Sequence, residues 1–288
     1  MSTRWPLSAY TISIPHMAPE QAVVAVRDAG YTGIEWSVHS HSPEISRQPT
    51  RLHRNDLGFV EAMPEAVRHA RVLSEAAGLR ISGLGLGGQF NRPDAAREAF
   101  ELGEIAGAPC IRIQAGSTLE GASFASAFES AQRICDGYVR EAEHHPDVKV
   151  VLHQHWGTAT ASASSLYRLL SRYDPRLIGC IYDPGNMFVE GYEDYRVGLG
   201  LLGSYVAHVH LKNVRYAHGL MVDGWHREWA PLDDGLVDLR HLFRALDEIG
   251  YAGWIVMSDV GESREEMAML RYNHAYVARE MECALQDA

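Results

Sequence analysis

Two pairs of histidines stand two residues apart in strand-like segments of the chain. His153 and His155 lie in VVLHQHW, and His208 and His210 lie in VAHVHLKN. Side chains two residues apart on a strand share a face. Asp183 ends a third such segment, LIGCIYD, directly before a Pro-Gly turn. Imidazoles with one carboxylate suit a divalent metal ion, so we predict His153, Asp183 and His210 as its ligands.

The other two histidines are interpreted differently. His155 shares a face with His153 and lies one step further along the strand. An unperturbed imidazole pKa of about 6.5 suits a general base at neutral pH, so His155 is the predicted catalytic base. His208 lies one step deeper than His210, and we expect it to be a hydrogen-bonded core residue.

Further candidates lie near the same strand ends. Glu35 is predicted as a catalytic residue on this rim, and a salt bridge to a loop arginine is the alternative. Lys212 shares a face with His210 and is predicted to donate to substrate oxygens. Asn186 either caps the following helix or contacts the substrate. Three tryptophans are expected either to wall the substrate site or to pack in the core: Trp36, Trp156 and Trp229.

Eight strand-like segments alternate with amphipathic helical stretches and would position these side chains. They span residues 7–14, 32–38, 80–87, 110–116, 148–156, 177–183, 206–213 and 253–260. Parallel strands joined by helices need both faces covered. Eight such units predict a closed (β/α)8 TIM barrel, whose active site lies at the carboxyl ends of the strands. A doubly wound open sheet is the alternative, but no GxGxxG follows the first segment. We expect one domain, residues 1–288.

Two long connections leave the carboxyl ends of predicted strands, at residues 39–58 and 214–235. Loops of this length are usually functional lids or binding loops, or else disordered. The second connection carries His226 and Arg227 between Trp225 and Trp229. Two tryptophans in one loop indicate that it is packed.

The composition and charge of the chain exclude several classes of binding partner. The 288 residues are 46% hydrophobic and carry a net charge of −11. No Lys/Arg run provides the basic surface that nucleic acid needs, and no apolar run reaches a membrane-span length. Four widely spaced cysteines and the absence of an apolar N-terminal segment favour a cytoplasmic protein with free thiols. We expect a small polar metabolite as ligand, with no nucleic acid or membrane partner.

The segments IYDPGNMFVEGYEDY, AHVHLKN and APLDDGLVD, in this order, resemble the xylose-isomerase-like sugar isomerase/epimerase superfamily. That group includes inosose dehydratase and, more distantly, endonuclease IV. The resemblance covers most of the chain, from YTGIE at Tyr31 to GWIV at Gly253. It implies a (β/α)8 barrel with a divalent ion held by Glu, Asp, His and Glu after strands five to eight. Carried over, the aspartate is Asp183 and the histidine is His210.

The chain departs from this pattern at both glutamates. His153 stands at the first glutamate position and Ser258 at the second, while Asp259 should point the other way unless the strand bulges. The remaining His-Asp-His set carries about one negative charge instead of about three. It therefore favours Mn²⁺, Co²⁺, Fe²⁺ or Zn²⁺ over Mg²⁺. The proton shuttle between two metal-bound glutamates, which the resemblance implies for the epimerases, is not expected here.

The sequence thus predicts an enzyme that removes a proton next to the carbonyl of a keto-sugar or cyclitol. The intermediate is either reprotonated, as in an isomerase or epimerase, or loses a β-substituent. Elimination would make the protein a lyase, such as an inosose-type dehydratase or a C-glycoside-cleaving subunit. A non-haem Fe²⁺ oxygenase is a weaker alternative. A metal-free barrel that binds sugar or supports a partner subunit is another, and a homo-oligomer is compatible with each.

Overall fold

The structure is a computed structural model that describes residues 3–40, 57–119, 121–219, 224–261 and 264–286. The strands are β1 (Leu7–Tyr10), β2 (Gly33–His39), β3 (Phe59–Glu61), β4 (Arg80–Leu86), β5 (Cys110–Ile113), β6 (Lys149–His153), β7 (Ile178–Tyr182), β8 (Val206–Leu211), β9 (Asn213–His218), β10 (Trp225–Ala230) and β11 (Ile255–Met257). The helices are α1 (Pro19–Asp28), α2 (Pro64–Ala76), α3 (Ala96–Ala106), α4 (Phe124–Ala142), α5 (Ala163–Leu170), α6 (Pro184–Glu190), α7 (Tyr195–Leu202), α8 (Leu239–Glu248) and α9 (Glu266–Gln286). Short 3-10 turns occur at Thr11–Ser13, Gly88–Phe90, Pro93–Ala95 and Gly203–Tyr205.

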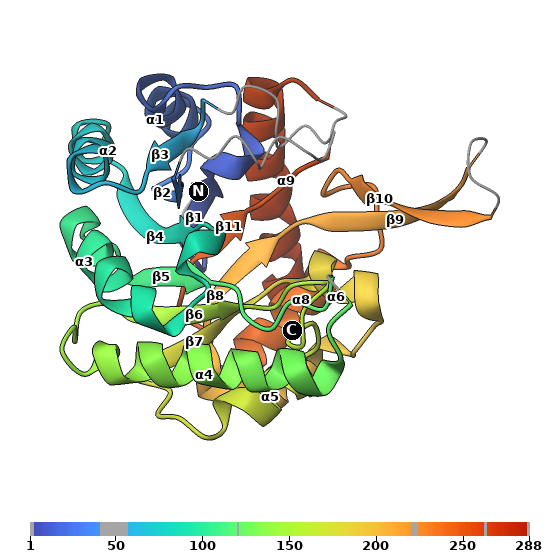
Figure 1. The fold of residues 1–288 in the computed structure, drawn as a ribbon. Coiled ribbons are helices and arrows are strands. Elements are labelled where there is room, and N and C mark those ends of the chain that lie inside the picture. Colours follow the sequence, from blue (N-terminus) through green and yellow to red (C-terminus); the bar gives the residue numbers. More distant parts are fainter. Residues whose placement is uncertain (1–2, 41–56, 120, 220–223, 262–263, 287–288) are drawn as a thin grey trace.

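Eight parallel strands close into a barrel. Their order is β1-β2-β4-β5-β6-β7-β8-β11, and β11 pairs with β1 to complete the ring. Helices surround the strands on the outside (Figure 1). The predicted (β/α)8 barrel is therefore confirmed, and each of the eight predicted segments overlaps one of its strands. The short β3 is an addition that pairs with the carboxyl end of β2, from Ser37 to His39.

In strand β2, alternate side chains face the barrel interior and the hydrophobic core between strands and helices. Ile34, Trp36 and Val38 belong to the large hydrophobic core that joins the strands to the surrounding helices. Glu35, between two of them, points to the other side, where it meets histidines of β8. The barrel interior is accordingly polar near the carboxyl ends of its strands. Deeper inside, a small apolar cluster of Cys110, Val151 and Ile181 fills it.

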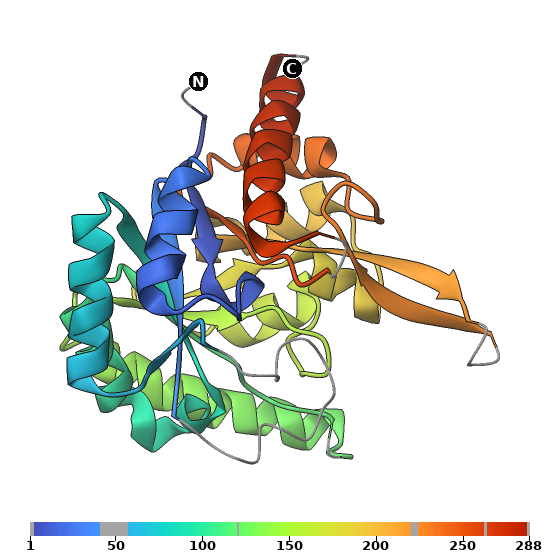
Figure 2. The same cartoon turned by 90° about the horizontal axis from the view of Figure 1, so that it is seen from above.

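The connection predicted at 214–235 is mostly an antiparallel hairpin of β9 and β10. Both views show it projecting from the barrel (Figures 1 and 2). Near its tip Trp225 is 73% exposed, so the expectation of a fully packed connection is wrong there. At its base Trp229 is partly buried and contacts Lys212. Of the other long connection, residues 41–56 lie outside the described residues.

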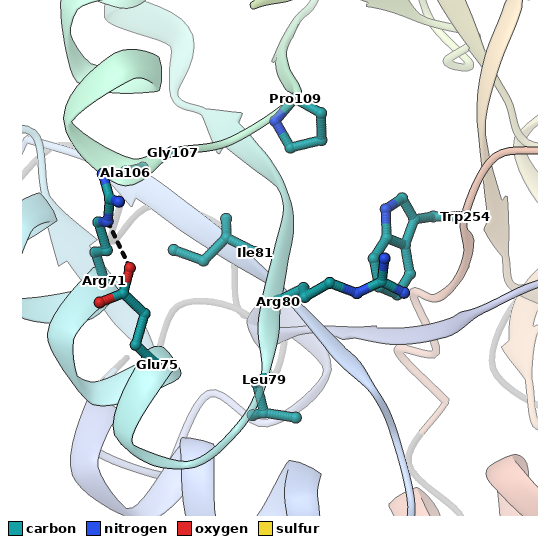
Figure 3. Close-up of a pocket in the computed structure, with 9 residues that line it drawn as sticks. All are labelled: Arg71, Glu75, Leu79, Arg80, Ile81, Ala106, Gly107, Pro109 and Trp254. Atoms are coloured by element: carbon teal, nitrogen blue, oxygen red, sulfur yellow. Dashed lines mark hydrogen bonds and ion pairs between the residues drawn. The ribbon is translucent and has the colours of Figure 1, made fainter. Parts of the chain in front are cut away.

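A hollow lies at the end of the barrel where the strands begin, near the amino ends of β4 and β5 (Figure 3). Its polar side chains are already engaged: Arg71 pairs with Glu75, and Arg80 lies over the Trp254 ring. Barrel enzymes keep their active sites at the other face. Within the described part of the chain, no helix is both long and apolar enough to span a membrane.

Candidate active site

Three neighbouring strands bring His153, Asp183 and His210 to one point. His153 is the last residue of β6, Asp183 follows β7, and His210 lies in β8. Their potential ligand atoms all lie within 4.8 Å of one another, and all three residues are buried. His153 Nε2 is 3.1 Å from Asp183 Oδ2, and the His153 and His210 rings are 5.1 Å apart. The arrangement places two imidazoles and a carboxylate around one point, where a divalent metal ion could bind.

Asp183 is held in place by the backbone that follows it. As the N-cap of α6, its Oδ1 accepts a hydrogen bond from the Asn186 backbone N–H at 2.8 Å, which satisfies an otherwise unpaired amide. The Asn186 side chain donates to Asp183 Oδ2 at 2.8 Å and to the carbonyl of Gln154 at 3.1 Å. Gln154 Oε1 in turn accepts from the Asp183 N–H. Asn186 thus holds the Asp183 carboxylate through both its backbone N–H and its side-chain amide.

Glu35 lies inside the barrel rather than on its rim. Its Oε2 accepts from His208 Nε2 at 2.8 Å and from His210 Nε2 at 2.9 Å. The expectation of a rim residue is wrong, because Glu35 lies four residues before the carboxyl end of β2. Its partners among the described residues are two histidines rather than a loop arginine. Burial would raise the Glu35 pKa, but His210 and the hydrogen bond from His208 hold it well below its usual range.

The same contact fixes the proton on His210. Burial lowers the pKa of His210 despite the opposing effect of Glu35, so the ring is neutral and carries one proton. A carboxylate only accepts, which places that proton on Nε2 and leaves a lone pair on Nδ1. His210 Nδ1 is buried and, among the described residues, has no hydrogen-bond partner. An unclaimed buried lone pair beside His153 and Asp183 fits a divalent metal ion, with Glu35 orienting the ligand.

His155 follows β6 and stands next to this cluster, with its ring 5.1 Å from that of His153. Its Nδ1 is 2.8 Å from the backbone oxygen of Trp156. A carbonyl only accepts, so Nδ1 carries the proton and Nε2 keeps a lone pair. Burial and the nearby Lys212 lower the pKa of His155 to about 4. The ring is therefore neutral at pH 7. The expectation of an unperturbed pKa is wrong, and the lowered pKa makes His155 a weaker base than a free imidazole.

A layer of cations and indoles lies over the same strand ends. Lys212 Nζ is 3.4 Å from Asp183 Oδ2 and 5.0 Å from the Trp229 ring centre. Arg227 of β10 lies 4.5 Å from the Trp156 ring and 5.2 Å from the Trp229 ring. Such contacts are attractive because the ring face is electron-rich. The base of the hairpin therefore connects to the cluster through Lys212.

Trp36 is not part of this site. It is fully buried, and its indole N–H donates to Ser74 of α2 at 3.0 Å. The interpretation of Trp36 as a substrate wall is wrong, because neighbours on a strand face opposite sides. Glu35 faces the interior, so Trp36 must face the helices.

The end of β11 carries the second substituted ligand position, Ser258. Val256 pairs with His210, and Ser258 N donates to the Leu211 carbonyl. Asp259 is directed outward, where it accepts from Asn273 of α9 at 2.8 Å. Asp259 is therefore not a replacement for the missing fourth ligand.

Three contributors were missed in the sequence: Tyr10 of β1, Arg112 of β5 and Gln154. Arg112 lies two residues after Cys110, which also faces the interior. A charged residue at an inward position of a strand was the available signal. Its nitrogen atoms lie 2.9 Å from the Tyr10 hydroxyl and 3.4 Å from His153 Nδ1.

Gly185, in the first turn of α6, leaves room for Lys212. A Cβ there would lie 2.7 Å from the Lys212 carbonyl oxygen and would overlap its side chain. We expect Gly185→Ala to lower the free energy of unfolding by about 1–3 kcal/mol, as overpacking does. Gly200→Ala in α7 is the matched control. It meets nothing within 4 Å and should stabilise by about 0.5–1 kcal/mol. Denaturant unfolding measures both, and equal effects would contradict the described packing of Lys212.

Comparison with known proteins agrees with this architecture. Residues 23–274 match the family described as "Xylose isomerase-like TIM barrel". The chain belongs to this family. The resemblance found in the sequence is thereby confirmed.

Individual relatives are more distant. Inosose dehydratase of Geobacillus thermodenitrificans is 29% identical over 143 residues, 46% of each chain. That of Klebsiella pneumoniae is 30% identical over 167 residues, 52% of this chain and 54% of the relative. The chain thus spans about half the length of the curated relatives it matches. An L-ribulose 3-epimerase structure superposes with a TM-score of 0.72 at 15% identity, covering 98% and 96% of the two chains, which shows the shared fold alone.

Proposed function

We propose that the protein is an enzyme that removes a proton next to the carbonyl of a keto-sugar or cyclitol. The observation that carries the proposal is the geometry of His155: its Nδ1–H is bonded to the Trp156 carbonyl, its ring lies 5.1 Å from that of His153, and no described residue bonds to its Nε2. A base held in one tautomer beside a candidate metal site suits this chemistry. The matched inosose dehydratases, and the epimerase of the same fold, make a lyase or an isomerase/epimerase the two outcomes.

His153, Asp183 and His210 would hold the divalent ion. When bound there, the ion would polarise the substrate carbonyl and acidify the neighbouring C–H. Two imidazoles and one carboxylate favour Mn²⁺, Co²⁺, Fe²⁺ or Zn²⁺ over Mg²⁺, which prefers a shell of oxygen ligands. Glu35 fixes the His210 tautomer through its hydrogen bond, so its role is positioning.

The remaining side chains bind and orient the substrate. Lys212 donates to substrate oxygens from its position over Asp183. Trp156 and Trp229 provide apolar faces for the C–H surface of a ring, and Asn186 holds Asp183 in register. His155 then takes the proton. Return of that proton to carbon gives an isomerase or epimerase, whereas loss of a β-substituent gives a lyase.

A metal-free sugar-binding barrel is the second candidate. It is favoured by Lys212, whose ammonium already lies against Asp183, and by Ser258 at a family ligand position. Under this alternative Lys212 neutralises Asp183 and no ion is needed.

Solvent exchange tests the proposal independently of the final product. A panel of keto-sugars, keto-glycosides and inososes is incubated with the protein in D₂O and followed by NMR. We expect deuterium to enter the carbon next to the carbonyl of at least one compound, with reprotonation or loss of a substituent separating the two classes. Absence of exchange throughout the panel, with each candidate metal supplied, would favour the binding barrel.

Ser258→Glu should restore a fourth ligand. We expect the dissociation constant for Mn²⁺ to fall by about tenfold or more, because ligand charge sets the affinity of oxygen-rich sites. Ser258→Gln, of the same length but neutral, is the control and should change it little. Calorimetric titration measures both, and equal affinities would mean that residue 258 does not face the ion.

A further inference from the structure

Arg112 is a buried cation without a carboxylate partner. The residue is 9% exposed, and within the described ranges no aspartate or glutamate forms an ion pair with it. Its two terminal nitrogens contact the Tyr10 hydroxyl at 2.9 Å and His153 Nδ1 at 3.4 Å. Its Nε is buried and has no hydrogen-bond partner in the described part of the chain. An uncompensated buried charge costs several kcal/mol, so this arrangement calls for an explanation.

The surroundings of Arg112 do not supply the missing anion. Glu35 is an inward-facing carboxylate whose Oε2 is engaged by two histidines; its Oε1 has no hydrogen-bond partner among the described residues, but no ion pair joins it to Arg112. Asp183 is shared among His153, Asn186 and Lys212. Strand β4 contributes no carboxylate on this side: a Cβ on Gly83 would approach Cys110 Sγ at 3.0 Å, and one on Gly85 would meet the Tyr10 ring. The described chain therefore offers no counter-ion to the guanidinium.

The site as a whole is richer in cations than in anions. Lys212 is buried beside Asp183, and Arg227 lies between two indole rings without a carboxylate partner in the described residues. With Arg112 this gives three cations around two buried carboxylates, Asp183 and Glu35, in a chain whose net charge is −11. Fixed positive charge concentrated in a site attracts an anionic ligand.

We propose that Arg112 is a binding residue for a carboxylate of the substrate. The site would then take polyhydroxy ketones that carry an acid group, which narrows the substrate class of the proposed function on which this inference rests. The planar guanidinium binds carboxylates through paired N–H groups, and its free Nε–H is one such donor. The long contact to His153 is readily given up when a carboxylate arrives. Tyr10 holds the guanidinium in place throughout.

The test uses acetate as probe, because it is small enough to reach Arg112 whatever the rest of the substrate. Acetate is titrated against the full-length, metal-loaded protein at constant ionic strength, with acetamide as its neutral counterpart. Binding is followed by calorimetry and by thermal unfolding. We expect saturable acetate binding and a raised unfolding temperature, with no saturable effect of acetamide. Arg112→Met should weaken acetate binding by about ten- to a hundredfold, the loss of a charge-assisted hydrogen bond.

Two further variants make the outcome decisive. Arg80→Met removes a positive charge at the opposite end of the barrel (Figure 3) and should leave acetate binding unchanged. Arg112→Lys keeps the charge without the paired donors and should bind acetate with intermediate affinity. This variant provides the test if Arg112→Met does not fold. The proposal is overturned if acetate and acetamide behave alike. It is also overturned if acetate binds both Arg112 variants as tightly as the native protein, since the anion would then be held elsewhere, for example by the metal ion.

The two proposals fail separately. Metal content of Arg112→Met should equal that of the native protein, because Arg112 is not a ligand. If exchange in D₂O is absent while acetate binding depends on Arg112, the subsite stands and the catalytic proposal falls. If exchange occurs only with neutral substrates and acetate does not bind, the catalytic proposal stands and the carboxylate subsite is overturned.

Discussion

Replacement of His155 by glutamine should lower the rate of proton exchange or turnover by about 10²–10⁴-fold, the usual contribution of a general base. Glutamine has similar length and can still donate to the Trp156 carbonyl, but it cannot take up a proton. Because His155 is not among the predicted ligands, metal content should be unchanged. The rate is measured by deuterium incorporation and the metal by elemental analysis.

The control for this variant is His144→Gln, which alters an exposed histidine after α4 and should have native activity. If His155→Gln loses the metal as well as activity, His155 is a ligand and the assignment of base and ligand must be exchanged. If activity survives, another group removes the proton.

Asp183→Asn should weaken metal binding by more than about 100-fold. Changing residues that only hydrogen-bond to the ligands typically weakens it by roughly 10–100-fold. The substitution removes the only carboxylate of the predicted ligand set while keeping the shape of the N-cap, since asparagine caps helices as well as aspartate does. Loss of affinity can therefore be separated from loss of α6. Calorimetric titration with Mn²⁺ or Zn²⁺ gives the change.

Asp194→Asn is the matched control because Asp194 caps α7 through two backbone N–H groups and is remote from the cluster. It should leave the affinity unchanged. His210→Ala should reproduce the effect of Asp183→Asn. Native stoichiometry and affinity in both site variants would mean that any bound ion lies elsewhere.

Strand alternation explains both what the sequence predicted and one of its errors. It placed His208, His210 and Lys212 on one face, and the structure has all three on the interior side of β8 and its end. The same rule shows that Glu35 and Trp36 cannot both face the interior, yet both were assigned to the site. Applying the period of two to each pair of neighbours would have excluded one of them.

Other features depend on tertiary contacts that no local pattern contains. The depth of Glu35 follows from the register of β2 against β1 and β4, and its partners are about 173 and 175 residues away in sequence. That no described carboxylate pairs with Arg112 is visible only once the neighbouring strands have been placed. The tautomer of His155 depends on a single hydrogen bond to the next residue's carbonyl, made after the strand has ended.

The most direct test of the account is the metal content of the purified protein, measured by elemental analysis before and after chelation, with thermal stability recorded alongside. We predict close to one divalent ion per chain, removed by the chelator with a fall in the unfolding temperature and restored by Mn²⁺, Co²⁺, Fe²⁺ or Zn²⁺. No bound ion, together with no stabilisation by any added divalent cation, would contradict the His153–Asp183–His210 site and favour the metal-free binding barrel.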